Sequence, residues 1–277
     1  MREETDLIGN HGHLVATLTH VDPAREPAGP RTGCLLMSAG VVHRIGPHRF
    51  NVKLARALAL AGIPAIRLDL AAVGDSRVPP VDTPYEQQAV IDLRAAIDHL
   101  IAQTGVSRVV VIGLCTGAVQ GLRCALSDDR VAGVAMIDGY AYPTVRTRRE
   151  RWLQRMRGLD HHMVARSLRA RVDRLRPDSP ARATPPTPAP GSGNPPREAL
   201  ADDLLGLLKR KVSIYQVFTG SILQHYNYAN QFRDGFAEWP ELAAIRTEYL
   251  PDIDHTFTTI ATQSFMIERL SAWALSV

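Results

Sequence analysis

The sequence predicts an α/β protein: a mostly parallel, doubly wound sheet with helices on both faces, interrupted by an inserted helical segment. Two observations predict the sheet. Short apolar runs recur without polar alternation, and stretches with helical spacing of apolar residues separate them. A third observation predicts the insertion, because the pattern stops near Pro143 and resumes near Val212. At 277 residues, the chain is long enough for one large domain of this kind.

The first half of the chain alternates strands and helices. Gly105 is expected to end the longest helix, because glycine adopts the left-handed conformation that closes helices. The expected strands are Leu14–Thr19 at an edge, Gly33–Met37, Pro64–Leu70, Arg108–Ile112 and Val131–Ile137, and the expected helices are Asn51–Ala61, Pro84–Gln103 and Thr116–Leu126. Right-handed connections between such strands favour a doubly wound sheet.

The inserted segment differs in composition from the rest of the chain. Residues 144–176 hold eleven arginines and three acidic residues, and residues 177–196 are rich in proline, alanine, serine and glycine. We therefore expect two parts of one α/β core, residues 1–142 and 211–277, with a helical lid at 143–210. The remaining expected elements are helices at Ala199–Lys209, Tyr226–Ala237 and Thr256–Leu275 and strands at Val212–Thr219 and Arg246–Leu250.

Composition excludes several classes of protein. The formal charge of +4 is only mildly basic and does not by itself indicate a nucleic-acid partner. Three cysteines cannot form a disulfide framework and favour a reducing compartment. The polar N-terminus does not resemble a signal peptide, and no apolar stretch is long enough to span a membrane. We therefore expect a cytoplasmic protein, and its oligomeric state stays open.

The segment from Val109 to Ala118 carries the strongest chemical signal. A continuous apolar strand runs into G-x-C-x-G and then into a helix, which is the spacing of a nucleophile elbow with Cys115 in place of serine. The turn is tight, so its neighbours must be small, and Gly113 and Gly117 meet that need. The helix N-terminus behind Cys115 favours a thiolate. A buried, inert cysteine flanked by glycines is the alternative interpretation.

Two further segments complete this pattern. His255 lies alone in the short loop between the last strand and the last helix, where chain order places the catalytic base; a solvated surface histidine is the alternative. The loop after Gly33–Met37 contains Gly40, which permits close backbone approach. The backbone N–H groups of Val41 and Thr116 are therefore the candidate donors of an oxyanion hole.

Taken together, the motifs SAGVVHRIGPHR, RLDLAAVGDS, GLCTGA and DIDHTF resemble the α/β-hydrolases over roughly residues 30–140 and 210–277. Within that superfamily the chain looks like the serine-aminopeptidase-like branch, and most like the hydrolases associated with exosortase systems. The resemblance implies a Ser, Asp or Cys nucleophile, an acid, a histidine and an oxyanion hole. It implies neither a metal ion nor an organic cofactor.

The chain departs from the family in its acid. The resemblance places that residue just after the strand Val212–Thr219, where no carboxylate occurs before Asp234. Asp138, at the end of the preceding strand, is the candidate substitute, because strand ends in a parallel sheet face the ligand crevice. From there it would orient the imidazole of His255. Asp234, Asp254, a bare Cys–His dyad and a purely structural Asp138 remain alternatives.

The cysteine suggests the reaction. A thiolate attacks acyl carbons and forms a thioester, from which transfer to an amine, thiol or hydroxyl competes readily with hydrolysis. The sequence therefore predicts ester or thioester cleavage through a Cys115–His255–Asp138 triad. The alternatives are an acyltransferase or cyclising thioesterase that takes its acyl group from a carrier protein or coenzyme A, and a ligand-binding protein of the same fold without turnover.

Several residues are weaker candidates. His43 and Arg44 would bind a substrate carboxylate or phosphate, or form salt bridges on a surface helix. Tyr140 would line the pocket under the lid or pack in the core, and His225 would touch substrate. The arginine-rich segment has three interpretations: it binds an acidic acyl carrier protein or coenzyme A, packs on acidic patches of the core, or is solvated. Cys34 and Cys124 are expected to be structural.

Overall fold

A single eight-stranded sheet organises the protein. The computed structural model describes residues 2–22, 32–80, 82–147, 149–150, 193–222 and 225–277. The strand order is β1-β2-β4-β3-β5-β6-β7-β8. The strands are β1 Glu3–Ile8, β2 Leu14–Thr19, β3 Thr32–Met37, β4 Ala65–Leu68, β5 Arg108–Leu114, β6 Val131–Ile137, β7 Ser213–Thr219 and β8 Arg246–Leu250. The helices are α1 Phe50–Leu60, α2 Tyr85–Thr104, α3 Thr116–Ser127, α6 Arg197–Lys209, α7 Gln231–Gly235 and α8 Ile260–Leu275.

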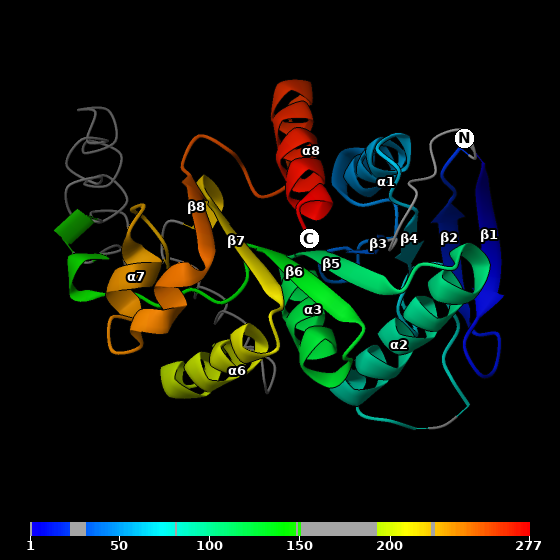
Figure 1. The fold of residues 1–277 in the computed structure, drawn as a ribbon, viewed down its shortest axis with the longest axis horizontal. Coiled ribbons are helices and arrows are strands. Elements are labelled where there is room, and N and C mark those ends of the chain that lie inside the picture. The colour runs from blue at the N-terminus through cyan, green and yellow to red at the C-terminus, as the bar shows by residue number, and fades with distance from the viewer. Residues whose placement is uncertain (1, 23–31, 81, 148, 151–192, 223–224) are drawn as a thin grey trace, which may run out of the picture.

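Helices cover both faces of the sheet (Figure 1), which confirms the doubly wound arrangement. Helices α1 and α8 contact each other and pack over one face, and α2, α3 and α6 cover the other. Each face has its own apolar cluster, and β5 lies between the two with every residue buried after Arg108. Burial on both sides explains why this strand reads as an unbroken β-branched run.

The N-terminal hairpin corrects the expected edge of the sheet. Residues 14–19 do form a strand, but β1 pairs with it in antiparallel register and is itself the edge. The exposure of β1 alternates, and its polar residues include Glu3, which pairs with Arg56 and Arg67. Alternation of charged and partly buried residues over six positions is a weak strand signal. Only the antiparallel pairing with β2 identifies residues 3–8 as a strand.

Two helix ends show where local sequence is and is not sufficient. Helix α2 ends at Gly105, which adopts the expected left-handed conformation with φ of 66°. The helix expected over residues 226–237 is shorter, because α7 covers only Gln231–Gly235. Tyr226 is buried instead, with its ring stacked on Phe218 at 3.7 Å between centroids. Because the chain at Tyr226 is placed by this packing, the helix begins only at Gln231.

The ends of the inserted segment lie side by side. The Tyr142 hydroxyl donates to the Pro195 carbonyl at 2.7 Å, and the Asn194 side chain donates to the Ala141 carbonyl. A segment whose ends meet in this way lengthens one connection without displacing the strands on either side. Residues 151–192, which make up most of the expected lid and of its arginine-rich stretch, lie outside the described residues.

The second boundary of the insertion needs correction. Helix α6, placed with the lid on the basis of sequence, buries Leu200, Leu204 and Leu207 in the apolar cluster shared with α3. It is therefore the helix that connects the parallel strands β6 and β7, as any such crossover requires. The core resumes near residue 197 rather than near 211. The proline-rich composition just before α6 concealed this boundary.

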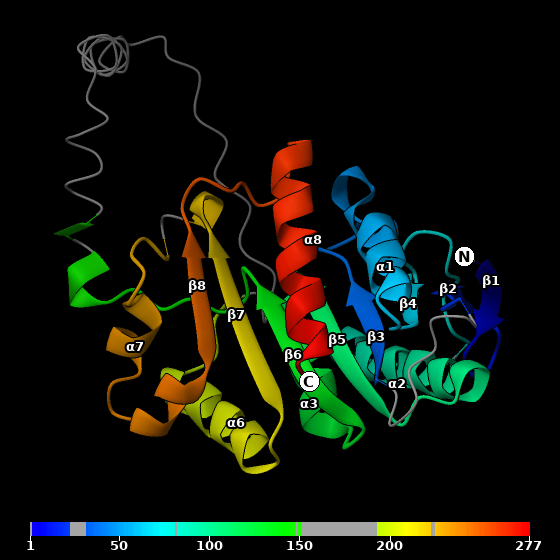
Figure 2. The same cartoon turned by 45° about the horizontal axis from the view of Figure 1, so that its top comes forward.

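The parallel strands place their C-terminal ends along one edge, as the arrowheads of β6, β7 and β8 show in Figure 2. Loops that follow β3, β5, β6, β7 and β8 therefore meet there. Among the described residues, no helix combines the length and apolarity needed to cross a membrane.

Candidate active site

Cys115 sits on a sharp turn between β5 and α3. Its backbone has φ of 57° and ψ of −117°, a conformation that non-glycine residues rarely adopt and that costs about 1–3 kcal/mol. Hydrogen bonds hold the turn: the Cys115 N–H donates to the Ile137 carbonyl at 2.8 Å, and the Ala118 N–H donates to the Cys115 carbonyl at 3.0 Å. The half-buried thiol thus lies at the C-terminal end of the central strand β5.

The glycines on either side make this turn possible, as the sequence predicts. A Cβ on Gly113 would lie 2.2 Å from the Gly117 carbonyl oxygen. A Cβ on Gly117 would lie 2.5 Å from the Ser38 carbonyl oxygen in the loop after β3. Both contacts are with backbone, which cannot rotate away. The G-x-C-x-G spacing therefore reflects close packing of three backbone segments around Cys115.

Replacing Gly113 with alanine is expected to lower the free energy of unfolding by about 1–3 kcal/mol, because the new methyl group overlaps backbone. Urea unfolding would measure it. Gly206→Ala in α6 is the matched control, because nothing lies within 4 Å of its Cβ and alanine favours a helix. Equal stability of Gly113→Ala and the native protein would contradict the close packing.

His255 and Asp138 form the rest of a hydrogen-bonded chain. His255 lies in the loop between β8 and α8, and its Nδ1 donates to Asp138 Oδ2 at 2.7 Å. Asp138 directly follows β6 and is only 6% exposed. The Cys115 thiol lies close enough to the same imidazole for the two groups to shift each other's pKa. The structure thus brings together the three residues expected from the sequence, in the order Cys115, His255, Asp138.

The electrostatics of this chain favour a charged pair. The hydrogen bond that His255 donates to Asp138, and then its interaction with Cys115, raise the pKa of His255 to about 10, against the effect of burial. The hydrogen bond from His255 lowers the pKa of Cys115, and burial opposes it. Both shifts favour a thiolate–imidazolium pair over a neutral thiol beside a neutral imidazole. Burial instead raises the pKa of the Cys124 thiol to about 12 and that of Cys34 further.

The other carboxylates considered for the acid lie elsewhere. Asp254 accepts hydrogen bonds from the N–H groups and hydroxyls of Thr256 and Thr258, and so closes its own loop. Asp234 lies near the Tyr228 hydroxyl and helps to raise its pKa. Within the part of the chain that the structure describes, Asp138 is the carboxylate that bonds His255.

The candidate oxyanion donors flank Cys115. The Thr116 N–H points to the sulfur of Cys115. The Thr116 hydroxyl also accepts the Gly40 N–H, which ties the elbow to the loop after β3. That loop turns at Gly40, whose φ is 51°. Among the described residues no acceptor takes the Val41 N–H, so it stays available for a ligand oxygen.

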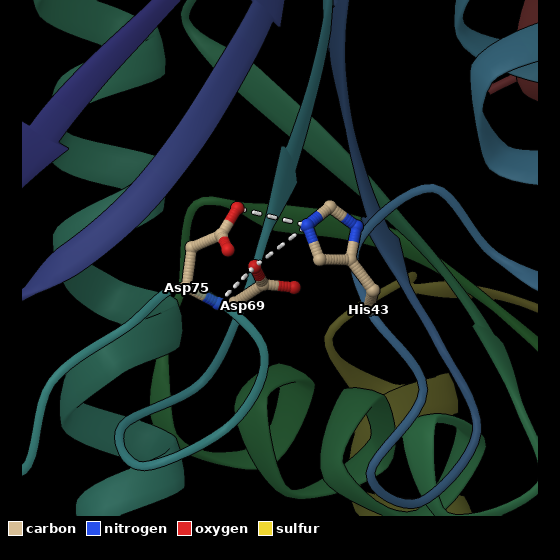
Figure 3. A group of neighbouring side chains, drawn as sticks. All are labelled: His43, Asp69 and Asp75. Carbon is tan, nitrogen blue, oxygen red and sulfur yellow. Dashed lines mark hydrogen bonds and ion pairs between the residues drawn. The ribbon is translucent and has the colours of Figure 1, made fainter.

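His43 and Arg44 lie in an ion-pair network rather than on a surface helix. Figure 3 shows His43 of this network with Asp69 and Asp75. The Arg44 guanidinium contacts Asp69 and Asp75 at 2.5 and 2.8 Å, and His43 lies 3.0 Å from Asp75. Arg44 also donates its Nε–H to Thr17 on β2. These contacts favour the salt-bridge interpretation of both residues, with Arg44 joining the loop after β3 to the loop after β4.

The same network contains the one grouping of metal-ligand side chains in the described residues. Ligand atoms of His43, Asp69 and Asp75 lie within 4.8 Å of one another. Arg44 already contacts both carboxylates, so a cation placed there would meet a guanidinium charge that is always present. The residues therefore do not fit a metal ion.

Tyr140 and His225 are not part of the hydrogen-bonded chain. Tyr140 is half-buried against the core, beside Leu200 and Phe218, and burial raises the pKa of its hydroxyl. His225 is exposed, and its backbone N–H donates to the Ile222 carbonyl. Neither side chain hydrogen-bonds to Cys115 or His255 within the described residues. Their contact with a substrate stays a prediction.

Sequence reasoning missed two residues at the end of β7. The Thr219 hydroxyl and N–H both donate to Asp138, and the Ser221 hydroxyl accepts the His255 N–H. The only signal in the sequence was their position, because Thr219 ends the strand after which the family resemblance places the acid and Ser221 lies in the loop that follows.

The chain was compared with known families and structures. A family model described as "Alpha/beta hydrolase family" matches residues 40–273. Similar solved structures include DcsB in complex with a substrate analogue, at 14% identity, a TM-score of 0.58, and 99% of each chain covered. The esterase domain of a Rhodothermus marinus protein has 18% identity and a TM-score of 0.55, with 99% of this chain and 97% of that chain covered.

Proline iminopeptidase from Mycobacterium smegmatis is also similar, at 16% identity and a TM-score of 0.52, with 99% of this chain and 98% of that chain covered. At such low identities these likenesses show the fold alone. No curated protein matches the chain.

Proposed function

Because the chain belongs to the alpha/beta hydrolase family, we propose that it cleaves an ester or thioester through an acyl-enzyme formed on Cys115. The observation that supports this most is the position of His255, which hydrogen-bonds to Asp138 on one side and interacts with the Cys115 thiol on the other. The strained backbone at Cys115 adds to it, because such strain concentrates at functional sites. Structurally similar proteins include serine hydrolases, so a cysteine at this position is a distinguishing feature of the proposal.

In the first half-reaction, the Cys115 thiolate attacks the carbonyl carbon. The N–H groups of Val41 and Thr116 bind the oxyanion as it forms. The tetrahedral intermediate collapses when His255, as imidazolium, donates its proton to the leaving alcohol or thiol. A thioester on Cys115 and a neutral imidazole remain, and Asp138 keeps Nε2 of that imidazole directed at the site.

In the second half-reaction, neutral His255 takes a proton from water, and the resulting hydroxide attacks the thioester. The thiolate leaves, the acid product is released, and the imidazolium is restored. An amine, thiol or hydroxyl acceptor in place of water would give transfer or cyclisation. The thioester intermediate favours this second function, because thioesters acylate such acceptors readily.

The direct test is mass spectrometry of the intact protein after brief incubation with an activated ester or thioester. We expect a mass increase equal to the acyl group, located on Cys115. Cys115→Ala should abolish the adduct, and Cys124→Ala should retain it, because that thiol is buried and protonated. Adding an amine or thiol acceptor would then divide the product between hydrolysis and transfer.

Absence of any adduct with several acyl donors would contradict the proposal. If the chain bound such donors tightly without turnover, it would be a ligand-binding protein of this fold instead.

A further inference from the structure

The carboxylate of Asp138 is held by a residue from the neighbouring strand. Thr219, the last residue of β7, is fully buried. Its N–H donates to Asp138 Oδ1 at 2.7 Å, and its hydroxyl donates to Oδ2 at 2.7 Å. Because the Ser221 N–H donates to the same hydroxyl oxygen at 3.3 Å, the hydroxyl proton is left to point at Asp138.

This arrangement fixes the carboxylate in the orientation that His255 uses. His255 Nδ1 donates to Oδ2, the oxygen that also takes the Thr219 hydroxyl. With a donor on each oxygen, the carboxylate cannot rotate about its Cβ–Cγ bond without breaking a buried hydrogen bond. The Asp138 N–H donates to the Val217 carbonyl on β7, so backbone and side chain are both joined to that strand.

The loop that carries His255 is held by the same end of β7. The Ser221 hydroxyl accepts the His255 N–H at 2.8 Å. Between Thr219 and Ser221, the Gly220 N–H donates to the Ile253 carbonyl at 2.9 Å. A Cβ on Gly220 would lie 1.9 Å from the Pro251 carbonyl oxygen, so the two loops are in direct backbone contact.

We propose that Thr219 and Ser221 are positioning residues of this site: Thr219 orients the carboxylate of Asp138, and Ser221 fixes the loop that presents His255. The inference builds on the proposed function, because it treats the Cys115–His255 pair as the reacting groups. Neither side chain needs to touch a substrate. Both therefore act on the reactivity of Cys115 and on kcat, and leave KM unchanged.

The test measures the alkylation rate of Cys115 by iodoacetamide at pH 7, which reports on the thiolate whether or not the chain turns over an ester. Thr219→Val removes the hydroxyl at nearly constant shape and is expected to lower the rate about fivefold, the equivalent of one ordinary hydrogen bond. Thr219→Ser should restore most of it. Ser221→Ala, at an exposed position that does not endanger folding, should also lower the rate.

Thr247→Val on β8 is the matched control and should alkylate like the native protein, because its hydroxyl only contacts the Ile245 carbonyl at 3.4 Å. On an accepted ester, Thr219→Val should lower kcat and leave KM unchanged. Native alkylation rates in both Thr219→Val and Ser221→Ala would overturn the inference. Slowed alkylation without any acyl-enzyme would uphold the positioning role and reject the proposed function.

Discussion

Replacing Asp138 with asparagine is expected to lower kcat on an activated thioester by about 10³-fold. Asparagine has the same shape and tolerates the positive φ of 50° at this position, so the fold should be kept. Its amide cannot stabilise an imidazolium, and its NH2 group favours the wrong tautomer of His255. Steady-state kinetics would show the fall in kcat with little change in KM, because Asp138 does not reach the substrate.

Asp234→Asn is the matched control, and we expect its kcat to equal that of the native protein, because that carboxylate lies beside Tyr228 rather than His255. If Asp138→Asn kept native turnover, the site would instead operate as a Cys115–His255 dyad. If Asp234→Asn lowered kcat and Asp138→Asn did not, Asp234 on α7 would be the acid.

The dependence of kcat/KM on pH is expected to be bell-shaped, and His255 is expected to determine the position of both limbs. The hydrogen bond from His255 lowers the pKa of Cys115, so activity should rise through a midpoint below the ordinary thiol value of about 8.5. Because Asp138 and Cys115 raise the pKa of His255 to about 10, activity should fall again near that pH. Above it, the imidazolium has lost the proton that the leaving group needs. Both midpoints belong to the interacting pair rather than to either residue alone.

His255→Ala is expected to lower kcat/KM by about 10²- to 10⁴-fold and to remove the limb near pH 10. Its acid midpoint should move up toward that of a free thiol. His99→Ala is the matched control. It removes an imidazole on α2 that pairs with Asp6 on β1, and the pH profile should stay bell-shaped. The thiolate–imidazolium pair would be contradicted if kcat/KM of the native protein rose with the midpoint of an ordinary thiol and did not fall again at alkaline pH.

The sharp turn at Cys115 was predictable because its signal is contiguous. A buried strand, two glycines and a helix start within ten residues specify the elbow around Cys115 without reference to the rest of the chain. His255 was predictable from chain order alone, as a histidine after the last strand. Both positions follow from local periodicity, which sequence records directly.

Which carboxylate bonds to His255 could not be decided in that way. Asp138 and His255 are 117 positions apart, and Asp138 and Thr219 are 81 apart. Whether they touch depends on the parallel pairing of β6 with β7 and on where each strand ends. The sequence left Asp138, Asp234, Asp254 and a dyad open because each reading satisfies the same local pattern.

By itself, the sequence determined the α/β class, the central strands, the sharp turn at Cys115 and the position of His255 after the last strand. These features depend on patterns within a few residues. A strand that is buried on both faces, for example, is a continuous run of apolar residues. Only the tertiary structure decided that β1 is an edge strand, that α6 belongs to the core, and that Thr219 and Ser221 hold Asp138 and His255 in place. The physical reason is that these depend on strand pairing and side-chain packing between distant segments, which no local pattern encodes.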